Sequence, residues 1–110
     1  MAGFVKGDVV VVPFPFSDLS QAKRRPCLVV CLLRGDDVVL CQITSRAISD
    51  EYAVPLDDSD FASGSLKQPS NVRPNRLFTA DHSLILRRVG SLRPDKMAQV
   101  IERLVSIIRA

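Results

Sequence analysis

The 110-residue chain contains no tryptophan, one tyrosine and one histidine. Aromatic residues make up 5% of the sequence, so few side chains are available for stacking on nucleic-acid bases. No apolar run approaches the ~18 residues that a membrane span requires, and the first residues lack the apolar stretch of a secretory signal. We therefore expect a cytoplasmic protein with no membrane partner.

Signatures of common cofactor and metal sites are also missing. The chain has no glycine-rich phosphate loop and no HExxH or GxSxG motif. Cys27, Cys31 and Cys41 lack CxxC spacing, and His82 is the only histidine that could join them as a zinc ligand. Cys27 and Cys31 share one predicted strand, about 13 Å apart, which is too far for a disulfide. We expect three reduced thiols that act as small buried hydrophobic groups, and neither a metal nor a cofactor.

Two small groups of polar residues could bind a metal or act in catalysis, but their spacing and position are more typical of solvent-exposed loop residues. Asp57, Asp58 and Asp60 lack the glycine and the distal glutamate of a calcium loop, so we interpret them as a solvated acidic loop. His82 lies beside Asp81 in a predicted turn and has the chemistry of a general acid or base. A lone histidine in a turn is more often simply exposed.

The overall composition is that of one folded domain. Hydrophobic residues make up 46% and charged residues 25%, which predicts a single domain over residues 1–110. The net charge of +3 is unevenly distributed, because residues 1–50 carry six basic and five acidic side chains, residues 51–66 none and four, and residues 67–110 nine and three. The basic second half suits a nucleic acid, an acidic protein, or a solvated surface without a partner.

Runs of β-branched and apolar residues predict about five short strands. These cover residues 8–12, 26–33, 38–44, 76–80 and 83–89, with a weaker edge strand within 52–56. Pro13 and Pro15 are expected to end the regular pairing of the first strand. Residues 34–37, Arg-Gly-Asp-Asp, are typical of a tight turn and predict a hairpin. Residues 57–70 are rich in Asp, Ser, Gly and Pro and predict a loop with at most one helical turn.

The C-terminal segment changes to a helical period. Pro94 suits a first helical turn and Asp95 suits the positive end of the helix dipole. One face gathers six apolar residues, namely Met97, Val100, Ile101, Leu104, Ile107 and Ile108. Strands followed by one amphipathic helix predict a mainly β fold, a small antiparallel barrel closed by a C-terminal helix, because βαβ units would need helical patterns between the strands.

The strongest candidate site surrounds Arg25. Pro26 biases Arg25 to an extended backbone, which helps to hold its guanidinium in one place. The hairpin returns Thr44, at the end of the paired strand, to the neighbourhood of Arg25. An arginine beside a hydroxyl can bind a phosphate, although an arginine paired with a surface carboxylate is an equally ordinary interpretation. The polar residues predicted to flank this pair are Ser17, Ser20, Gln21, Arg24 and Arg46.

With these residues in view, the chain resembles the MazF/PemK (Kid-type) toxins of bacterial toxin-antitoxin pairs. The resemblance extends from Gly7 to the C-terminal helix. It is carried by the segments Gly7-Asp8-Val9-Val10, Ser20-Gln21, Arg25-Pro26-Cys27-Leu28-Val29-Val30 and Gln42-Ile43-Thr44-Ser45. It implies an SH3-like barrel, a homodimer, and a metal-independent endoribonuclease that cuts single-stranded RNA at short sequence motifs. It also implies an acidic cognate antitoxin that blocks the toxin by lying across the dimer groove.

The resemblance also implies roles for individual residues. Arg25 matches the catalytic arginine of the family, and Thr44 matches its catalytic threonine or serine. Ser17, Ser20 and Gln21 fall in the RNA-contacting loop, and Asn75 and Arg76 in the segment that lines the groove. The complete set of predicted RNA-contacting residues is Phe16, Ser17, Ser20, Gln21, Arg24, Arg46, Asn75 and Arg76. Phe14, Phe16 and Tyr52 are the candidates for base stacking, although each phenylalanine also suits the core.

Arg25 and Thr44 fit the chemistry of RNA cleavage without a metal. The 2′-hydroxyl attacks the adjacent phosphate and leaves a 2′,3′-cyclic phosphate and a 5′-hydroxyl, while the enzyme positions the attack and neutralises charge on the phosphate oxygens. Arginine and threonine can donate the required hydrogen bonds, but neither is an effective base at neutral pH.

Two other functions share this architecture. A CcdB-like toxin would bind DNA gyrase mainly through the C-terminal helix and would need no phosphate site. A non-catalytic SH3-like barrel would bind a nucleic acid or a protein. Loss of RNA cleavage on substitution of Arg25 distinguishes the endoribonuclease from both.

Overall fold

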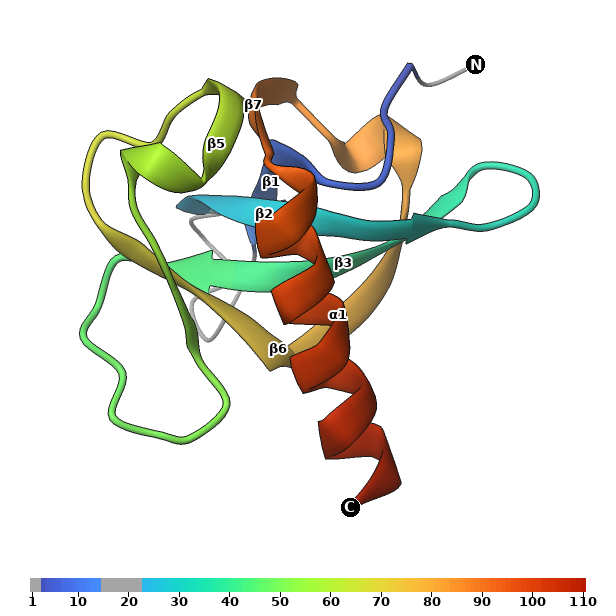
Figure 1. The fold of residues 1–110 in the computed structure, drawn as a ribbon. Helices are drawn as coiled ribbons and strands as arrows, with labels where there is room; N and C mark the ends of the chain where they lie inside the picture. Colours follow the sequence, from blue (N-terminus) through green and yellow to red (C-terminus); the bar gives the residue numbers. More distant parts are fainter. Residues whose placement is uncertain (1–2, 15–22) are drawn as a thin grey trace.

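The computed structural model describes residues 3–14 and 23–110 (Figure 1). Within them, seven strands form one antiparallel sheet in the order β4-β6-β3-β2-β1-β7-β5, and the sheet curls into a half-barrel with one C-terminal helix. The predicted fold class is therefore confirmed. The strands are β1 (Asp8–Phe14), β2 (Lys23–Leu32), β3 (Asp37–Thr44), β4 (Val54–Leu56), β5 (Phe61–Gly64), β6 (Ser70–Asp81) and β7 (Arg87–Leu92). The helix is α1 (Pro94–Arg109), and the two 3-10 turns are η1 (Asp58–Asp60) and η2 (His82–Leu84).

The β2–β3 hairpin forms as the turn sequence predicts. Leu32 pairs with Val38, and the Leu33 N–H donates to the Asp37 carbonyl oxygen at 3.0 Å. Gly35 adopts a φ of 79°, a conformation that a glycine reaches without the steric penalty of a Cβ. This turn closes one end of the hairpin, so Arg25 and Thr44 both belong to the opposite end.

The prediction that Pro13 ends the pairing of the first strand is wrong, and Pro15, which belonged to the same prediction, lies outside the described residues. Pro13 pairs with Arg24, and Phe14 pairs with Lys23. On its other side β1 pairs with β7 only as far as Val11. Pro13 therefore sits where β1 has become an edge strand, so its missing N–H removes no hydrogen bond on that side.

The second half of the chain departs most from the predicted boundaries. β6 begins six residues before the predicted position 76, and β7 covers 87–92 rather than 83–89 because η2 occupies 82–84. Residues 57–70 contain the expected single turn, η1, but also the unpredicted strand β5, which pairs with β7. Of its four residues only Phe61 is a typical strand former, so pairing with β7 determines the conformation.

Hydrophobic residues are buried on both faces of the sheet. In β1, Val9 belongs to one buried cluster and its neighbour Val10 to the other, as alternation along a strand requires. The first cluster is covered by α1 through Met97 and Val100. The second contains Cys27, so β2 is buried on both faces as predicted.

Helix α1 begins at the predicted Pro94 and confirms the amphipathic pattern in part. Met97 and Val100 are buried, Ile101, Leu104 and Ile107 are half-buried, and Ile108 is 67% exposed. Ile108 lies in the last turn, where the helix extends past the sheet (Figure 1). In the part of the chain that the structure describes, no helix is long and apolar enough to cross a lipid bilayer.

Candidate active site

Arg25 lies near the start of β2 and is half-buried. The residue after it, Pro26, pairs with Val11 on β1, and the pairing of β2 with β3 begins at Cys27 and Gln42. Pro26 restricts the backbone of Arg25 to extended conformations.

Thr44 is the last residue of β3, and its side chain is buried. Its Oγ1 accepts a hydrogen bond from the Arg46 N–H at 3.2 Å. A hydroxyl carries one donor and two acceptor positions. Thr44 can therefore keep this contact and still donate its own hydrogen to a bound phosphate.

The hairpin brings Arg25 and Thr44 together. Cys27 pairs with Gln42 across β2 and β3, and two further residues along each strand place Arg25 opposite Thr44. Both residues line two neighbouring pockets, one of about 490 Å³ and one of about 280 Å³. Arg25 and Thr44 therefore border the same two pockets, at the end of the hairpin opposite its turn.

We call the larger of these the strand-end pocket. Besides Arg25 and Thr44, it is lined by the basic residues Arg24, Lys67 and Arg87. Lys67 belongs to the segment between β5 and β6, whose residues 65–68 form one wall. Among the described residues, no aspartate or glutamate lines this pocket. Its electrostatic character therefore favours an anion.

We call the smaller one the arginine pocket. It is lined by Arg25, Arg46, Arg73 and Arg76, with Thr44 and Gln42 between them. Arg73 also forms an ion pair with Asp50, with Nη2 and Oδ2 3.2 Å apart. Within residues 3–14 and 23–110, no carboxylate lines this pocket either.

The predicted site residues are only partly brought together. Arg24, Arg25, Thr44, Arg46 and Arg76 line one or both pockets. Asn75 is exposed and Tyr52 is half-buried, and neither lines them. The predicted residues Phe16, Ser17, Ser20 and Gln21 lie outside the described residues.

Sequence reasoning missed several residues of the two pockets, namely Gln42, Lys67, Arg73 and Arg87. For Gln42 and Arg73, the alternation of side chains along the strands could have indicated a position on the same face as Thr44. Gln42 is two residues from Thr44 and pairs with Arg73 on β6, so the three side chains share one face. The pairing of β6 with β3 was not predicted, and so neither residue was placed at the site.

The other polar candidates have structural roles away from this site. The His82 Nε2 lies 3.3 Å from Oδ1 of Asp36, in the turn at the far end of the β2–β3 hairpin. Asp57 caps η1 by accepting from the Ser59 N–H, and its own N–H donates to Asp60. These contacts with Ser59 hold the pKa of Asp57 below its usual range. In the described part of the chain, no three His, Cys, Asp or Glu side chains gather as a metal site requires.

The three cysteines are free thiols, and Cys27 and Cys41 are buried while Cys31 is half-buried. Burial raises the pKa of both Cys27 and Cys41 to about 12, because a thiolate loses its hydration in the core. Thiolate chemistry at these two positions is therefore suppressed at neutral pH.

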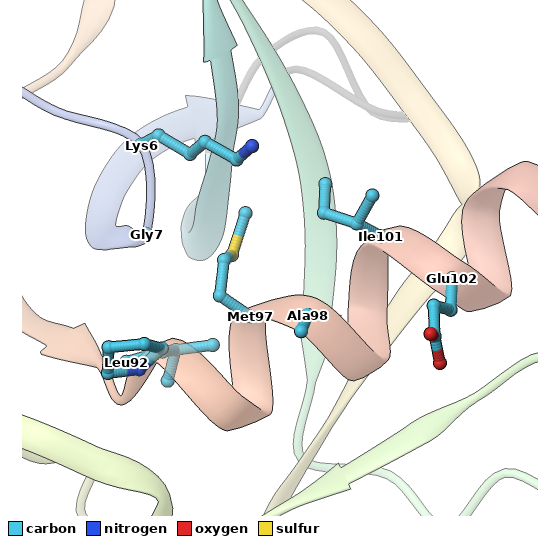
Figure 2. Close-up of a pocket in the computed structure, with 8 residues that line it drawn as sticks. Lys6, Gly7, Leu92, Met97, Ala98, Ile101 and Glu102 are labelled. Carbon is cyan, nitrogen blue, oxygen red and sulfur yellow. The ribbon is translucent and has the colours of Figure 1, made fainter.

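A third cavity, of about 530 Å³, lies between α1 and the segment before β1 (Figure 2). Met97 and Ile101 of the helix face Lys6 across it, while Glu102 points away. None of the predicted site residues that the structure describes lines this cavity. The chemistry-bearing residues gather instead at the ends of β2 and β3.

Comparison of the sequence with models of protein families finds a match over nearly the whole chain. The model of the PemK-like, MazF-like toxins of type II toxin-antitoxin systems matches residues 5–108. The chain belongs to this family. A comparison of this PemK-like chain with curated proteins finds no match.

Three solved structures with the same fold are mycobacterial and deinococcal proteins. An endoribonuclease in complex with its cognate antitoxin, from a mycobacterial species, superposes with a TM-score of 0.78 at 16% identity, covering 97% of this chain and 96% of that one. MazF from Deinococcus radiodurans gives a TM-score of 0.74 at 24% identity, covering 97% of each chain. The Mycobacterium tuberculosis toxin MazF-mt6 gives 0.71 at 20% identity, covering 93% and 96%. At these identities the likeness shows that the MazF-like chain shares their fold.

Proposed function

We propose that this MazF-like toxin is a metal-independent endoribonuclease that cuts single-stranded RNA at short sequence motifs. The observation that carries the proposal is the position of Arg25 and Thr44, which meet at the ends of two paired strands and line two basic pockets. The fold shared with a mycobacterial endoribonuclease supports it.

In the proposed reaction the RNA supplies its own nucleophile. The 2′-oxygen attacks the adjacent phosphorus as its proton leaves, the bond from phosphorus to the 5′-oxygen breaks, and the 5′-oxygen takes up a proton. The products carry a 2′,3′-cyclic phosphate and a 5′-hydroxyl. Arg25 and Thr44 donate hydrogen bonds to the phosphate oxygens, where negative charge increases in the transition state.

The proposed protein partner is an acidic cognate antitoxin that covers the two basic pockets. Arg24, Arg25, Lys67 and Arg87 line the strand-end pocket without any carboxylate among the described residues. An acidic segment would be attracted to this surface and would exclude RNA from it. One solved structure with the same fold contains a cognate antitoxin.

We further propose that the toxin is a homodimer, as the family resemblance implies. Val105 and Ile108 near the end of α1 are 38% and 67% exposed, which leaves apolar surface for a second subunit. Light scattering coupled to gel filtration gives the mass directly. A monomer at micromolar concentration would contradict this part of the proposal.

The decisive experiment for the nuclease is incubation of a long single-stranded RNA with the purified toxin in EDTA. We expect discrete cuts with 5′-hydroxyl ends, and the mapped ends report the recognition motif. Arg25→Ala should lower kcat by about 100-fold or more, since removal of one donor to a developing oxyanion has this effect. Thr44→Val should also lower kcat, while Thr44→Ser should restore it because the hydroxyl is retained.

Arg34→Ala is the matched control, because Arg34 is an exposed arginine in the turn at the other end of the same hairpin. It should cut at the wild-type rate. Intact RNA after incubation with folded, antitoxin-free protein would contradict the proposal and favour a binding function.

A further inference from the structure

The arginine pocket gathers more positive charge than the cleavage chemistry requires. Arg25 belongs to the proposed catalytic pair, but Arg46, Arg73 and Arg76 also line this space of about 280 Å³. Among the described residues, Arg46 and Arg76 form no ion pair with a carboxylate. Like charges held together in one pocket repel each other, and a bound anion removes that repulsion.

An irregularity in β6 builds one wall of this pocket. Cys41 pairs with Leu77, but the next residue of β3, Gln42, pairs with Arg73. Residues 74–76 therefore have no partner on β3 and form a bulge, a device that redirects side chains at functional sites. The bulge places Arg76 in the pocket beside Arg73.

The loop between β3 and β4 forms the other wall, and Asp50 anchors it to β6. Oδ1 of Asp50 accepts from the backbone N–H groups of Tyr52 at 3.0 Å and Ala53 at 2.9 Å. Oδ2 accepts from Nη2 of Arg73 at 3.2 Å. One carboxylate thus holds the loop turn and orients a pocket arginine.

Arg73 is held by Asp50 yet keeps donors without a partner among the described residues. Its side chain is 17% exposed, and its Nε is buried without an acceptor among the described residues. A guanidinium carries five N–H donors. Among residues 3–14 and 23–110, the Arg73 guanidinium makes one hydrogen bond, to Asp50. The remaining donors suit the two oxygens of a phosphate.

We propose that the arginine pocket is a second phosphate-binding subsite, which holds the RNA phosphate next to the scissile one through Arg73, with Asp50 as the residue that positions Arg73. This inference rests on the proposed endoribonuclease function. It follows from the shared walls of the two pockets, because Arg25 and Thr44 line both. A strand whose scissile phosphate lies at Arg25 therefore has its neighbouring phosphate within reach of Arg73.

The test measures binding of a mixed-sequence single-stranded RNA made entirely with 2′-O-methyl groups, which cannot be cut by the proposed reaction. Fluorescence anisotropy gives the dissociation constant at a series of KCl concentrations. We expect Arg73→Met to weaken binding about tenfold. It should also lower the slope of log K against log salt concentration by about 0.7, the value for one lost phosphate contact on a single strand. Arg73→Lys should keep most of the slope because it keeps the charge.

The positioning role of Asp50 needs a double-mutant cycle. Asp50→Asn should weaken RNA binding when Arg73 is present and should have little effect in the Arg73→Met background, because Asp50 acts through Arg73. A purely structural anchor of the loop would have the same effect in both backgrounds.

Arg103→Met is the matched control for loosening of the loop. Nη1 of Arg103 donates to the carbonyl oxygens of Glu51 at 2.7 Å and Ala53 at 3.4 Å, so it holds the same loop from α1 without lining the pocket. It should leave the salt slope unchanged. An equal loss of binding and slope in Arg103→Met and Arg73→Met would assign the effect to the loop and overturn the subsite.

Cleavage of long RNA by the same wild-type preparation keeps the two proposals distinguishable. Wild-type protein that cuts RNA, with Arg73→Met unchanged in affinity and slope, overturns the subsite and leaves the nuclease intact. A slope drop in protein that does not cut supports the phosphate subsite and contradicts the nuclease. An unchanged slope for RNA with weaker binding of a poly-glutamate peptide would assign the pocket to an acidic partner and overturn the subsite.

Discussion

Asp8 is fully buried, and its Oδ1 lies 3.7 Å from Nη1 of Arg88, a residue that is itself half exposed. The other oxygen, Oδ2, accepts from the Val5 N–H at 2.9 Å. Asp8 is the first residue of β1, and Arg88 lies on the neighbouring strand β7. The carboxylate therefore ties the segment before β1 to the sheet and partly offsets its own desolvation through Arg88.

Replacement of Asp8 by alanine should lower the free energy of unfolding by about 1–3 kcal/mol, because the Val5 N–H loses its buried acceptor. Urea denaturation followed by circular dichroism measures the change. Asp37→Ala is the control, since Asp37 is also the first residue of a strand but is exposed. Equal losses in the two variants would show that the buried carboxylate makes no special contribution.

Replacement of Gly64 by alanine should destabilise the β5–β7 pair. Gly64 has a φ of 67°, and a Cβ there would overlap the carbonyl oxygen of Val89. Gly35→Ala is the control, because Gly35 has a φ of 79° but open space around its Cα. Gly35→Ala should cost about 1–2 kcal/mol from backbone strain alone, and Gly64→Ala should cost clearly more. Equal losses would show that β5 moves away from β7 easily.

Asp50 should make the toxin lose stability in acid. Partial desolvation raises its pKa, but the N–H groups of Ala53 and Tyr52 and the Arg73 guanidinium outweigh this and hold the pKa below 3.8. A carboxyl with a lowered folded-state pKa stabilises the fold above its unfolded-state pKa, and this stability is lost as the pH falls through the folded-state pKa.

Wild type should therefore be more stable than Asp50→Asn at neutral pH, and the difference should shrink only below about pH 4. Urea denaturation of both proteins from neutral pH to about pH 3 tests this. A difference that stays constant over the whole range would show that the charge of Asp50 is not what stabilises the loop.

The three thiols should differ in reactivity. Cys27 and Cys41 have pKa values raised to about 12 by burial, and Cys31 is half-buried. Titration with a thiol reagent at about pH 8 should modify Cys31 first, and the other two only when denaturant is added. Cys31→Ser should abolish the fast phase. Fast modification of two or more thiols in the native toxin would contradict the buried positions of Cys27 and Cys41.

Local sequence signals were sufficient to predict that Arg25 and Thr44 lie near each other. Residues 34–37 form a tight turn, and the lengths of the flanking apolar runs then bring the two residues to the same end of a hairpin. Pro94 and the 3.6-residue apolar period were likewise sufficient for α1. The hairpin and the helix depend on interactions between residues close in sequence. Local sequence patterns are therefore enough to predict them.

Only the tertiary structure placed Arg73 and Lys67 at the site, and only it shows how Arg76, which the family resemblance implied, reaches the arginine pocket. Arg73 reaches it because β6 pairs with β3, and Arg76 because the bulge at residues 74–76 breaks that pairing. Lys67 reaches it because β5 pairs with β7 and carries the following segment over the strand ends. Strand pairing between distant segments depends on packing in the whole sheet and leaves no local pattern. The sequence alone thus determined the hairpin with its arginine and threonine, and the long-range pairing of β6 and β5 determined which other charges surround them.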